Sequence, residues 1–269
     1  MIGETSMRRI PGRGSSHGTT PDSGSGAHPL TRRRLALAGA AASLAVARPA
    51  TAASRTIYFM RGKGASSLLP ETDYQAMLRN LFKADKVVFD LDGGRAQFLS
   101  QFFAADIAYL SLHASETKLK VGNGDVVEAA DLQRAYQQAG KGPTLTIVAG
   151  CNTTKDSPLL VNIPESIGIG AGKRAYIGFH TPVVGFYADR FFRFFFPHWV
   201  NPAPGGSYRT LVEAGTAAHD FIDARVKAAA GSADRTVKPG VLGAAQPQDK
   251  LAHGSYDVLG NRGLRISDI

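Results

Sequence analysis

Five short apolar runs, separated by segments with a helical period, constrain the fold of this chain most strongly. The runs have the length and composition of buried strands and occupy residues 56–60, 86–91, 107–112, 144–149 and 174–179. Periodic segments predict helices at residues 70–82, 95–104, 128–139, 165–171, 183–200 and 208–230. Strands that alternate with helices in this way connect by right-handed crossovers into a parallel sheet. We therefore predict an α/β fold in which helices flank a mainly parallel sheet.

These predicted strands and helices form one domain, residues 54–230. No internal repeat and no long linker interrupts this range. The C-terminal tail, residues 231–269, has a weaker pattern. Its last part, residues 256–266, has the composition of an edge strand or a hairpin.

The segment in front of this domain, residues 1–53, has the features of an export signal. Residues 1–30 are rich in Gly, Ser, Thr and Pro, which predicts disorder. Arg32 and Arg33 then precede a short apolar stretch that ends in the A-x-A pattern of residues 50–52. This order resembles a bacterial twin-arginine (Tat) signal peptide and predicts a periplasmic or secreted protein. A lone membrane anchor is the alternative, but the stretch is short and Ala-rich, so we expect no membrane association after cleavage.

The formal net charge of +9 reports mostly on this signal. Cleavage after Ala52 removes seven basic and two acidic residues, which leaves 24 basic and 20 acidic residues in the mature chain. The remaining basic residues do not gather with aromatic residues in one block. We therefore predict no nucleic-acid partner.

Cys151 is the only cysteine of the chain, and it follows the predicted strand 144–149. His113 follows the predicted strand 107–112 in the same way. Active sites of open α/β sheets form outside the carboxyl ends of the strands, so these two ends can bring a thiol and an imidazole to one rim. A thiolate beside a base is the minimum equipment for covalent acyl transfer. The alternative role for a lone cysteine is that of a small buried apolar residue, but the position at a strand end favours a reactive thiol.

The order of these segments resembles the caspase-like fold of clan CD cysteine peptidases, and most closely its bacterial CHAT-type branch. The segments that carry the resemblance are Leu110–Ser115, Leu119–Leu132, Gly170–Phe179 and Leu211–Ala218. The resemblance implies a three-layer architecture and an endopeptidase that acts on peptides or proteins. It also implies that Cys151 is the nucleophile and His113 the base or proton shuttle. The backbone N–H groups of Cys151 and Ala114 would bind the oxyanion, and neither a metal nor an organic cofactor would be needed.

Two positions depart from the family pattern. Ala114 stands where the family usually has Gly after the histidine, and Gly150 stands where a small residue such as Ala is usual. Both departures are compatible with the chemistry, and both are also compatible with a relative that has lost activity. A non-catalytic binding module on the same fold therefore remains the alternative function.

Charged residues at two other strand ends suggest how a substrate would be recognised. Arg61 would favour an acidic side chain before the scissile bond, whereas Asp90 or Asp92 would favour a basic one. The segment from Val87 to Gly94 also resembles the first motif of HAD-type phosphohydrolases, in which two acids bind Mg²⁺. Its usual Thr is replaced by Gly94, and acidic residues at strand ends are also common as turn and cap residues.

The predicted helix 183–200 contains eight aromatic residues. Such a helix would suit a membrane surface, but it has few basic residues for a polar face. Burial against the sheet is the favoured interpretation, and a surface for a protein partner is the alternative.

Overall fold

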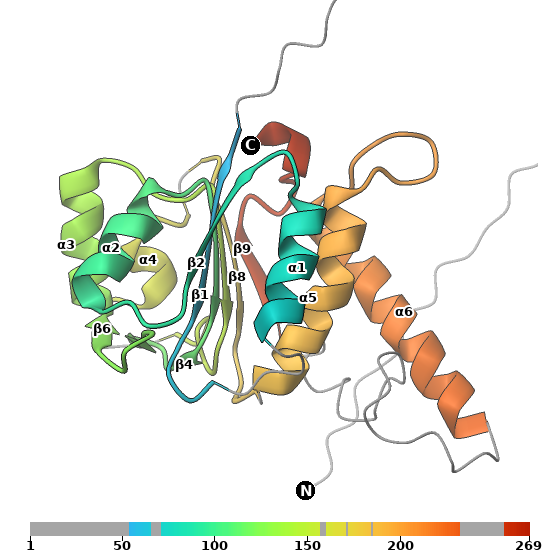
Figure 1. Cartoon of the computed structure of the whole chain (residues 1–269), viewed down its shortest axis with the longest axis horizontal. Coiled ribbons are helices and arrows are strands. Elements are labelled where there is room, and N and C mark those ends of the chain that lie inside the picture. The colour runs from blue at the N-terminus through green and yellow to red at the C-terminus, as the bar shows by residue number, and fades with distance from the viewer. Residues whose placement is uncertain (1–53, 66–70, 157–159, 171, 184, 232–255) are drawn as a thin grey trace, which may run out of the picture. The chain divides into compact units, whose positions relative to one another are not determined.

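A mainly parallel six-stranded sheet forms the centre of the computed structural model (Figure 1), which describes residues 54–65, 71–156, 160–170, 172–183, 185–231 and 256–269. The strands are β1 (Thr56–Arg61), β2 (Lys86–Asp90), β3 (Ile107–Ser111), β7 (Leu145–Ala149), β8 (Ala175–Phe179) and β9 (Tyr256–Gly260). Their order in the sheet is β2-β1-β3-β7-β8-β9. Strands β1, β2, β3, β7 and β8 are parallel to one another, and β9 pairs antiparallel with β8. The predicted α/β fold with a mainly parallel sheet is confirmed.

The chain divides into two units, Met1–Ala50 and Thr51–Ile269, and the described residues belong to the second. The predicted export signal therefore lies outside the described residues and stays a prediction. The same holds for most of the predicted tail, residues 232–255. Of the two forms left open for the last part of the tail, the structure has the edge strand, β9.

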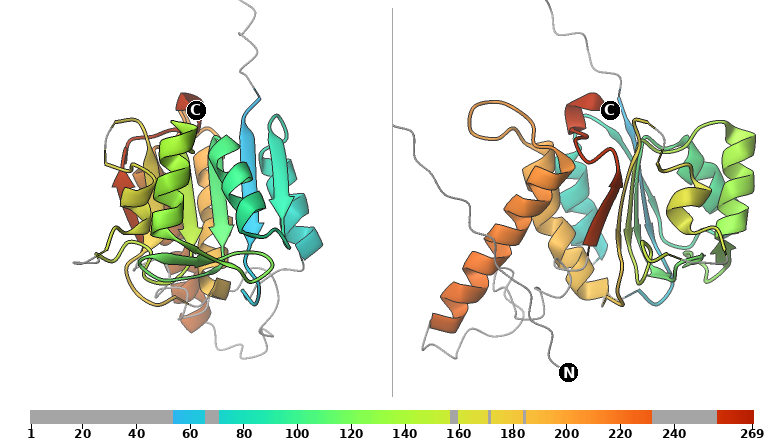
Figure 2. Two further views of the ribbon diagram at one scale, coloured as in Figure 1. Left: turned by 90° about the vertical axis from the view of Figure 1, so that its left-hand side faces the viewer. Right: turned by 180° about the vertical axis from the view of Figure 1, so that it is seen from behind.

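Helices cover both faces of the sheet and complete three layers (Figures 1 and 2). One face carries α1 (Glu71–Leu81), α5 (Gly185–Val200) and α6 (Leu211–Gly231), and we call it the α5 face. The other carries α2 (Arg95–Ala104), α3 (Ala129–Ala139) and α4 (Ile163–Ser166), and we call it the α3 face. Because both faces are covered, the central strands β3, β7 and β8 are buried along their whole length. This is why they appear in the sequence as continuous apolar runs.

Alternate residues of each strand enter one of the two cores. Tyr109 and Ile147 pack on the α5 face, whereas Leu110 and Val148 pack on the α3 face. This alternation follows from the two-residue period of a strand. It decides which side chains share a face at the carboxyl ends of the strands.

The aromatic residues of α5 belong mostly to the core. Phe191, Phe192, Phe195, Phe196 and Trp199 are at most 1% exposed. The favoured interpretation of burial is thus confirmed for these five residues, and the alternative of a partner surface made from them is wrong. No described helix is long and apolar enough to cross a membrane.

A small antiparallel sheet follows β3 and leads into α3. Its strands are β4 (His113–Ala114), β5 (Lys118–Lys120) and β6 (Val126–Glu128), in the order β4-β5-β6. Helix α3 then begins with a capping box formed by Glu128 and Asp131, and it ends at Gly140, which adopts a left-handed conformation. The small sheet carries His113 away from the central sheet directly after β3 ends.

Two helix boundaries differ from the sequence prediction by three residues or more. The segment predicted as a helix at 165–171 forms only the four-residue α4, because Gly168 and Gly170 adopt positive φ angles that a helix does not allow. Helix α6 begins at Leu211 rather than at residue 208, because Thr210 and Glu213 cap its first turn reciprocally.

Candidate active site

His113 and Cys151 occupy equivalent positions beyond two neighbouring parallel strands. Ser111 of β3 is the register partner of Ala149 of β7, and each functional residue lies two positions further along its chain. The pairing extends one residue past the strands, because Leu112 N–H donates to Ala149 O at 3.3 Å. The prediction that these two residues follow adjacent parallel strands is confirmed.

The two side chains are also on the same side of the sheet by strand alternation. Tyr109 and Ser111 of β3 face α5, and so do Ile147 and Ala149 of β7. Leu112 and Ala114 pack in the core of the α3 face, so His113 between them points away from that core, and the Cys151 thiol contacts Val183, which packs on the core of the α5 face. Both side chains thus point away from the α3 face, with the His113 ring at Gly64 beyond β1 and the thiol at Val183 beyond β8.

Gly150 and Ala114 meet on the opposite, α3 side. A Cβ atom placed on Gly150 would lie 2.8 Å from Ala114 Cβ and 2.9 Å from Leu112 O. A side chain at position 150 would thus collide with Ala114, which makes glycine necessary there. The two departures from the family pattern compensate each other, because the methyl group of Ala114 fills the space that an alanine at position 150 would need.

The His113 ring is exposed and makes one hydrogen bond with the described residues. Its Nε2 lies 3.0 Å from Gly64 O. A carbonyl oxygen can only accept, so Nε2 carries the hydrogen and donates it. In the neutral ring this arrangement leaves Nδ1 as the basic nitrogen, available to take a proton.

The Cys151 thiol is half-buried and contacts the backbone of Val183. Val183 N–H donates to Sγ at 3.3 Å, and Sγ lies 3.2 Å from Val183 O, to which the neutral thiol can donate. No hydrogen bond joins Cys151 and His113 in the described part of the chain. Catalytic hydrogen bonds are often long in ligand-free enzymes and tighten when substrate binds, so this geometry is compatible with a catalytic pair.

A constrained turn follows Cys151. Asn152 is the one non-glycine residue with a positive φ, 55°, among the described positions. Hydrogen bonds anchor the turn to the end of β8: Asn152 N–H donates to Thr181 O at 3.2 Å, and Phe179 N–H donates to Thr153 Oγ1 at 3.1 Å. Left-handed backbone at a non-glycine residue costs free energy and persists only where the surroundings enforce it.

The two backbone N–H groups predicted to bind an oxyanion are available. Cys151 N–H donates to no acceptor within the described ranges. Ser115 N–H donates to Lys118 O, so the next pair, Ala114 and Leu119, is a non-hydrogen-bonded pair of the antiparallel ladder. Ala114 N–H consequently points away from β5. Two such donors at one rim are the equipment that stabilises a tetrahedral oxyanion.

Arg61 lies below this rim and already contacts a carboxylate. Its guanidinium is 3.5 Å from Asp189, a residue of α5 that is 1% exposed. Asp189 also accepts hydrogen bonds from Tyr109 Oη and Ser111 Oγ, each at 2.9 Å. Burial and the negative charge of Asp189 hold the pKa of the Tyr109 hydroxyl well above its usual value. The contact with Asp189 offsets the charge that Arg61 would offer to an acidic substrate side chain.

Asp90 and Asp92 have different surroundings. Asp90 is 4% exposed and accepts hydrogen bonds from Tyr58 Oη at 2.8 Å and from Gly93 N–H at 2.7 Å. Burial and this hydrogen bond raise the pKa of the Tyr58 hydroxyl. Asp90 therefore caps the end of β2, as the alternative to the phosphohydrolase interpretation predicted. Within the described residues no group of three or more His, Cys, Asp or Glu side chains is arranged to hold a metal ion.

Asp92 is exposed and lines a hollow of about 300 Å³ beside Gly64, the residue that accepts the His113 hydrogen bond. The other residues that line this hollow are Arg61, Gly62, Lys63, Ala65, Leu91, Gly122 and Asn123. Asp92 makes no ion pair with another described residue. Of the three charged residues predicted to contact substrate, it is the one whose charge is not already engaged.

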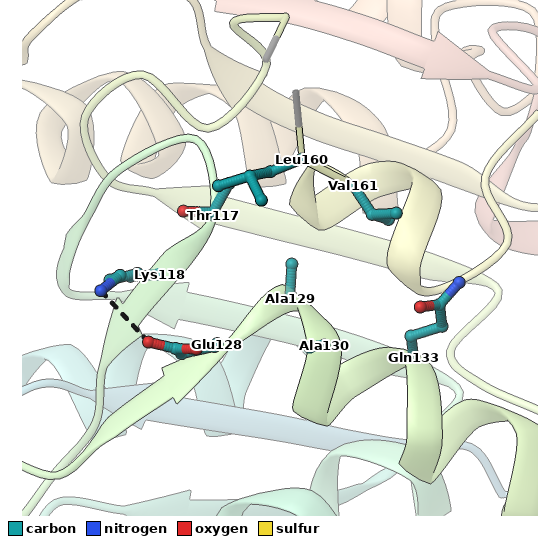
Figure 3. Close-up of a pocket in the computed structure, with 8 residues that line it drawn as sticks. All are labelled: Thr117, Lys118, Glu128, Ala129, Ala130, Gln133, Leu160 and Val161. Carbon is teal, nitrogen blue, oxygen red and sulfur yellow. Dashed lines mark ion pairs between the residues drawn. The ribbon is translucent and has the colours of Figure 1, made fainter. Parts of the chain in front are cut away.

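A second hollow, of about 410 Å³, opens beside β5 and the start of α3 (Figure 3). The ion pair of Lys118 with Glu128, at 3.1 Å, borders it on one side. Leu160, which is 64% exposed, and Val161 border it on another. This hollow lies next to the hairpin that follows His113, and its lining is mixed polar and apolar.

Sequence reasoning missed three contributors to this rim. Val183 and Gly64 act through backbone atoms, so no side-chain pattern could indicate them. His180 follows a predicted strand directly, and the rule that singled out His113 would have found it. Its Nδ1 lies 3.0 Å from Asp257 Oδ2, and the same oxygen accepts a hydrogen bond from Thr154 Oγ1 at 2.7 Å.

Comparison with solved structures supports the caspase-like fold. The Arg-specific cysteine proteinase gingipain R matches with a TM-score of 0.54 and 11% sequence identity, over 78% of this chain and 46% of that one. The complex of Porphyromonas gingivalis RgpB pro- and mature domains matches with a TM-score of 0.53 and 12% identity, over 78% and 48% of the two chains. The chain thus spans about half the length of these proteins, and at this identity the likeness concerns the fold alone. No family model and no curated protein matches the sequence.

Proposed function

We propose that this chain is a cysteine endopeptidase of the caspase-like type, with Cys151 as nucleophile and His113 as base. The observation that carries the proposal is the equivalent placement of the two residues beyond the neighbouring parallel strands β3 and β7. The caspase-like fold is compatible with this chemistry. Membership of the CHAT-type branch rests on the sequence motifs and is part of the proposal.

The proposed reaction begins when His113 Nδ1 takes the proton of the Cys151 thiol. The thiolate attacks the peptide carbonyl, and the N–H groups of Cys151 and Ala114 donate to the oxygen that becomes negative. The imidazolium then gives its proton to the departing amine, and an acyl-enzyme remains. Water, deprotonated by the same imidazole, releases the acid product and restores the thiol. Val183 N–H supports the thiolate, because it already donates to Sγ.

The proposed substrate carries a basic side chain before the scissile bond, because Asp92 presents an exposed carboxylate in the hollow beside Gly64. Arg61 is the weaker candidate for a substrate contact, since Asp189 already neutralises it. Asp90 is buried and fully engaged by Tyr58 and Gly93. Proteins and peptides are thus the proposed partners, and neither a cofactor nor a metal enters the proposed reaction.

Export through the Tat pathway is a separate part of the proposal. It is supported by the sequence of residues 31–52 and would place the mature enzyme in the periplasm or outside the cell. Replacement of Arg32 and Arg33 by Lys tests it. The double variant should accumulate in the cytoplasm as the precursor, and normal maturation would contradict the proposed localisation.

A non-catalytic module on the same fold is the alternative function. The observation that favours it is the contact of the Cys151 thiol with Val183 instead of His113. Two measurements on the mature protein separate the functions: alkylation of Cys151 by iodoacetamide at pH 7, and digestion of a peptide library. A peptidase should be alkylated quickly and should cleave the library in a way that prior alkylation abolishes. Slow alkylation without cleavage would leave the binding module as the function.

A further inference from the structure

A hydrogen-bonded cluster joins the C-terminal strand to the turn that carries Cys151. Asp257 lies on β9, and its Oδ2 accepts hydrogen bonds from Thr154 Oγ1 at 2.7 Å and from His180 Nδ1 at 3.0 Å. Thr154 is three residues after Cys151 and is separated from Asp257 by 103 positions in the sequence. The cluster is therefore a long-range link and not a local turn contact.

The turn that this cluster holds is the one that presents the nucleophile. It contains Asn152 in a left-handed conformation, which needs support from its surroundings. Thr154 N–H donates to Phe179 O at 3.2 Å, so β8 already holds the backbone of the turn. The Thr154 hydroxyl adds a side-chain hydrogen bond between this turn and β9.

His180 does not share the side of the sheet that Cys151 occupies. Phe179 of β8 packs on the α5 face, so the next residue points toward the α3 face by strand alternation. Asp257 is the register partner of Gly178, which places it on the α3 side as well. The cluster thus contacts the turn through the Thr154 hydroxyl, and no hydrogen bond among the described residues joins it to Sγ.

We propose that Asp257 is a positioning residue for the active site, which acts through the hydroxyl of Thr154. By holding Thr154, it keeps Cys151 N–H and Sγ in the orientation that attack and oxyanion binding require. His180 supports Asp257 with a second hydrogen bond and has a smaller effect. This inference rests on the proposed role of Cys151, and it assigns a function to the C-terminal strand that neither the motifs nor the dyad include.

The test compares variants that remove the link with variants that keep it. Asp257→Ala and Thr154→Val each remove it, whereas Asp257→Asn keeps an acceptor oxygen and Thr154→Ser keeps the hydroxyl. We expect each of the first two to lower kcat about tenfold with little change in KM, which corresponds to a single lost interaction of about 1.4 kcal/mol. The conservative variants should stay within about twofold of the wild type. A purely structural role would lower the amount of folded enzyme and leave kcat per folded active site unchanged.

A second readout keeps this test independent of peptidase activity. The rate of Cys151 alkylation by iodoacetamide at pH 7 should fall in Asp257→Ala and Thr154→Val, and the double variant should be no slower than the slower single one. Thr216→Val, in which a helical hydroxyl bonded to Val212 O is removed, is the matched control and should change nothing. If the wild type cleaves no peptide but these alkylation effects appear, the proposed peptidase function is wrong and the positioning role of Asp257 stands. If Thr154→Val leaves the alkylation rate unchanged, or if the two effects add, the positioning role is wrong.

Discussion

Two histidines lie on either side of the turn that contains Cys151, and they differ in their hydrogen-bond partners and in the face of the sheet on which they lie. His113 follows β3 and His180 follows β8, the two neighbours of the strand that ends before Cys151. His180 has the stronger support, because it donates to a carboxylate, whereas His113 donates to a backbone carbonyl. Yet strand alternation places His113, and not His180, on the side of the thiol. The comparison teaches that the number of hydrogen bonds an imidazole makes does not decide its role: in the proposed mechanism His113 is the base because of the face it occupies, although His180 is held by a carboxylate.

The largest effect should come from the proposed nucleophile and the proposed base. Cys151→Ala should lower kcat by about 10⁴-fold or more, and His113→Ala by about 10²- to 10⁴-fold, because covalent and proton-transfer catalysis are lost. His180→Ala should cost less than about fivefold, since this ring only supports Asp257. Steady-state kinetics on a fluorogenic peptide measure all three. A loss in His180→Ala that equals the loss in His113→Ala would reverse the assignment of the base.

The next prediction compares two carboxylates: Asp189, which is buried and pairs with Arg61, and Asp257, which is more exposed and pairs with His180. Asp189→Ala would leave the Arg61 guanidinium, 13% exposed, without its carboxylate, and it should lower the free energy of unfolding by about 3–5 kcal/mol. Asp257→Ala should lower the free energy of unfolding by less than about 1 kcal/mol, because both side chains of its pair with His180 are well exposed, Asp257 at 38% and His180 at 45%. Urea denaturation at pH 7 measures both values. Equal destabilisation by the two variants would contradict the difference in burial.

A smaller effect tests the contact between the segments that carry His113 and Cys151. Gly150→Ala should lower the free energy of unfolding by about 1–3 kcal/mol, because the new methyl group collides with Ala114. Ala114→Gly in the same chain should restore part of the loss, because it removes the collision with the Ala114 methyl group but not the one with Leu112 O. Thermal unfolding of the wild type, the two single variants and the double variant completes a double-mutant cycle. Independent effects of the two substitutions would show that the segments do not touch as described.

The smallest effect concerns the hollow on the His113 side. Asp92→Asn should lower kcat/KM about tenfold for peptides with Lys or Arg before the scissile bond, because a charge-assisted contact is lost. Peptides with a neutral residue at that position should be cleaved as before. Asp90→Asn is the comparison variant and should leave the preference unchanged, since Asp90 is buried. Profiling with a peptide library reads out the preference. An unchanged preference in Asp92→Asn would remove this residue from the substrate contacts.

The arrangement of strands and helices could be read from local pattern. A continuous apolar run such as residues 107–112 indicates a strand covered on both faces, because the period of the apolar residues is a local property of the chain. The position of His113 and Cys151 beyond two adjacent strands was also predictable, since parallel strands end at one edge of the sheet. The helix at 165–171 was overestimated, because the positive φ angles of Gly168 and Gly170 depend on the loop around them.

The partners of the charged groups were not predictable from the sequence. Arg61 and Asp90 looked alike as charged residues at strand ends, but one meets Asp189 of α5 and the other meets Tyr58 of β1. The link from Thr154 to Asp257 spans 103 positions and depends on β9 joining the sheet beside β8. Local sequence sets the period and the ends of each element. The pairing of polar groups across elements follows from packing, because a buried polar group must form a hydrogen bond with whichever group the fold brings next to it.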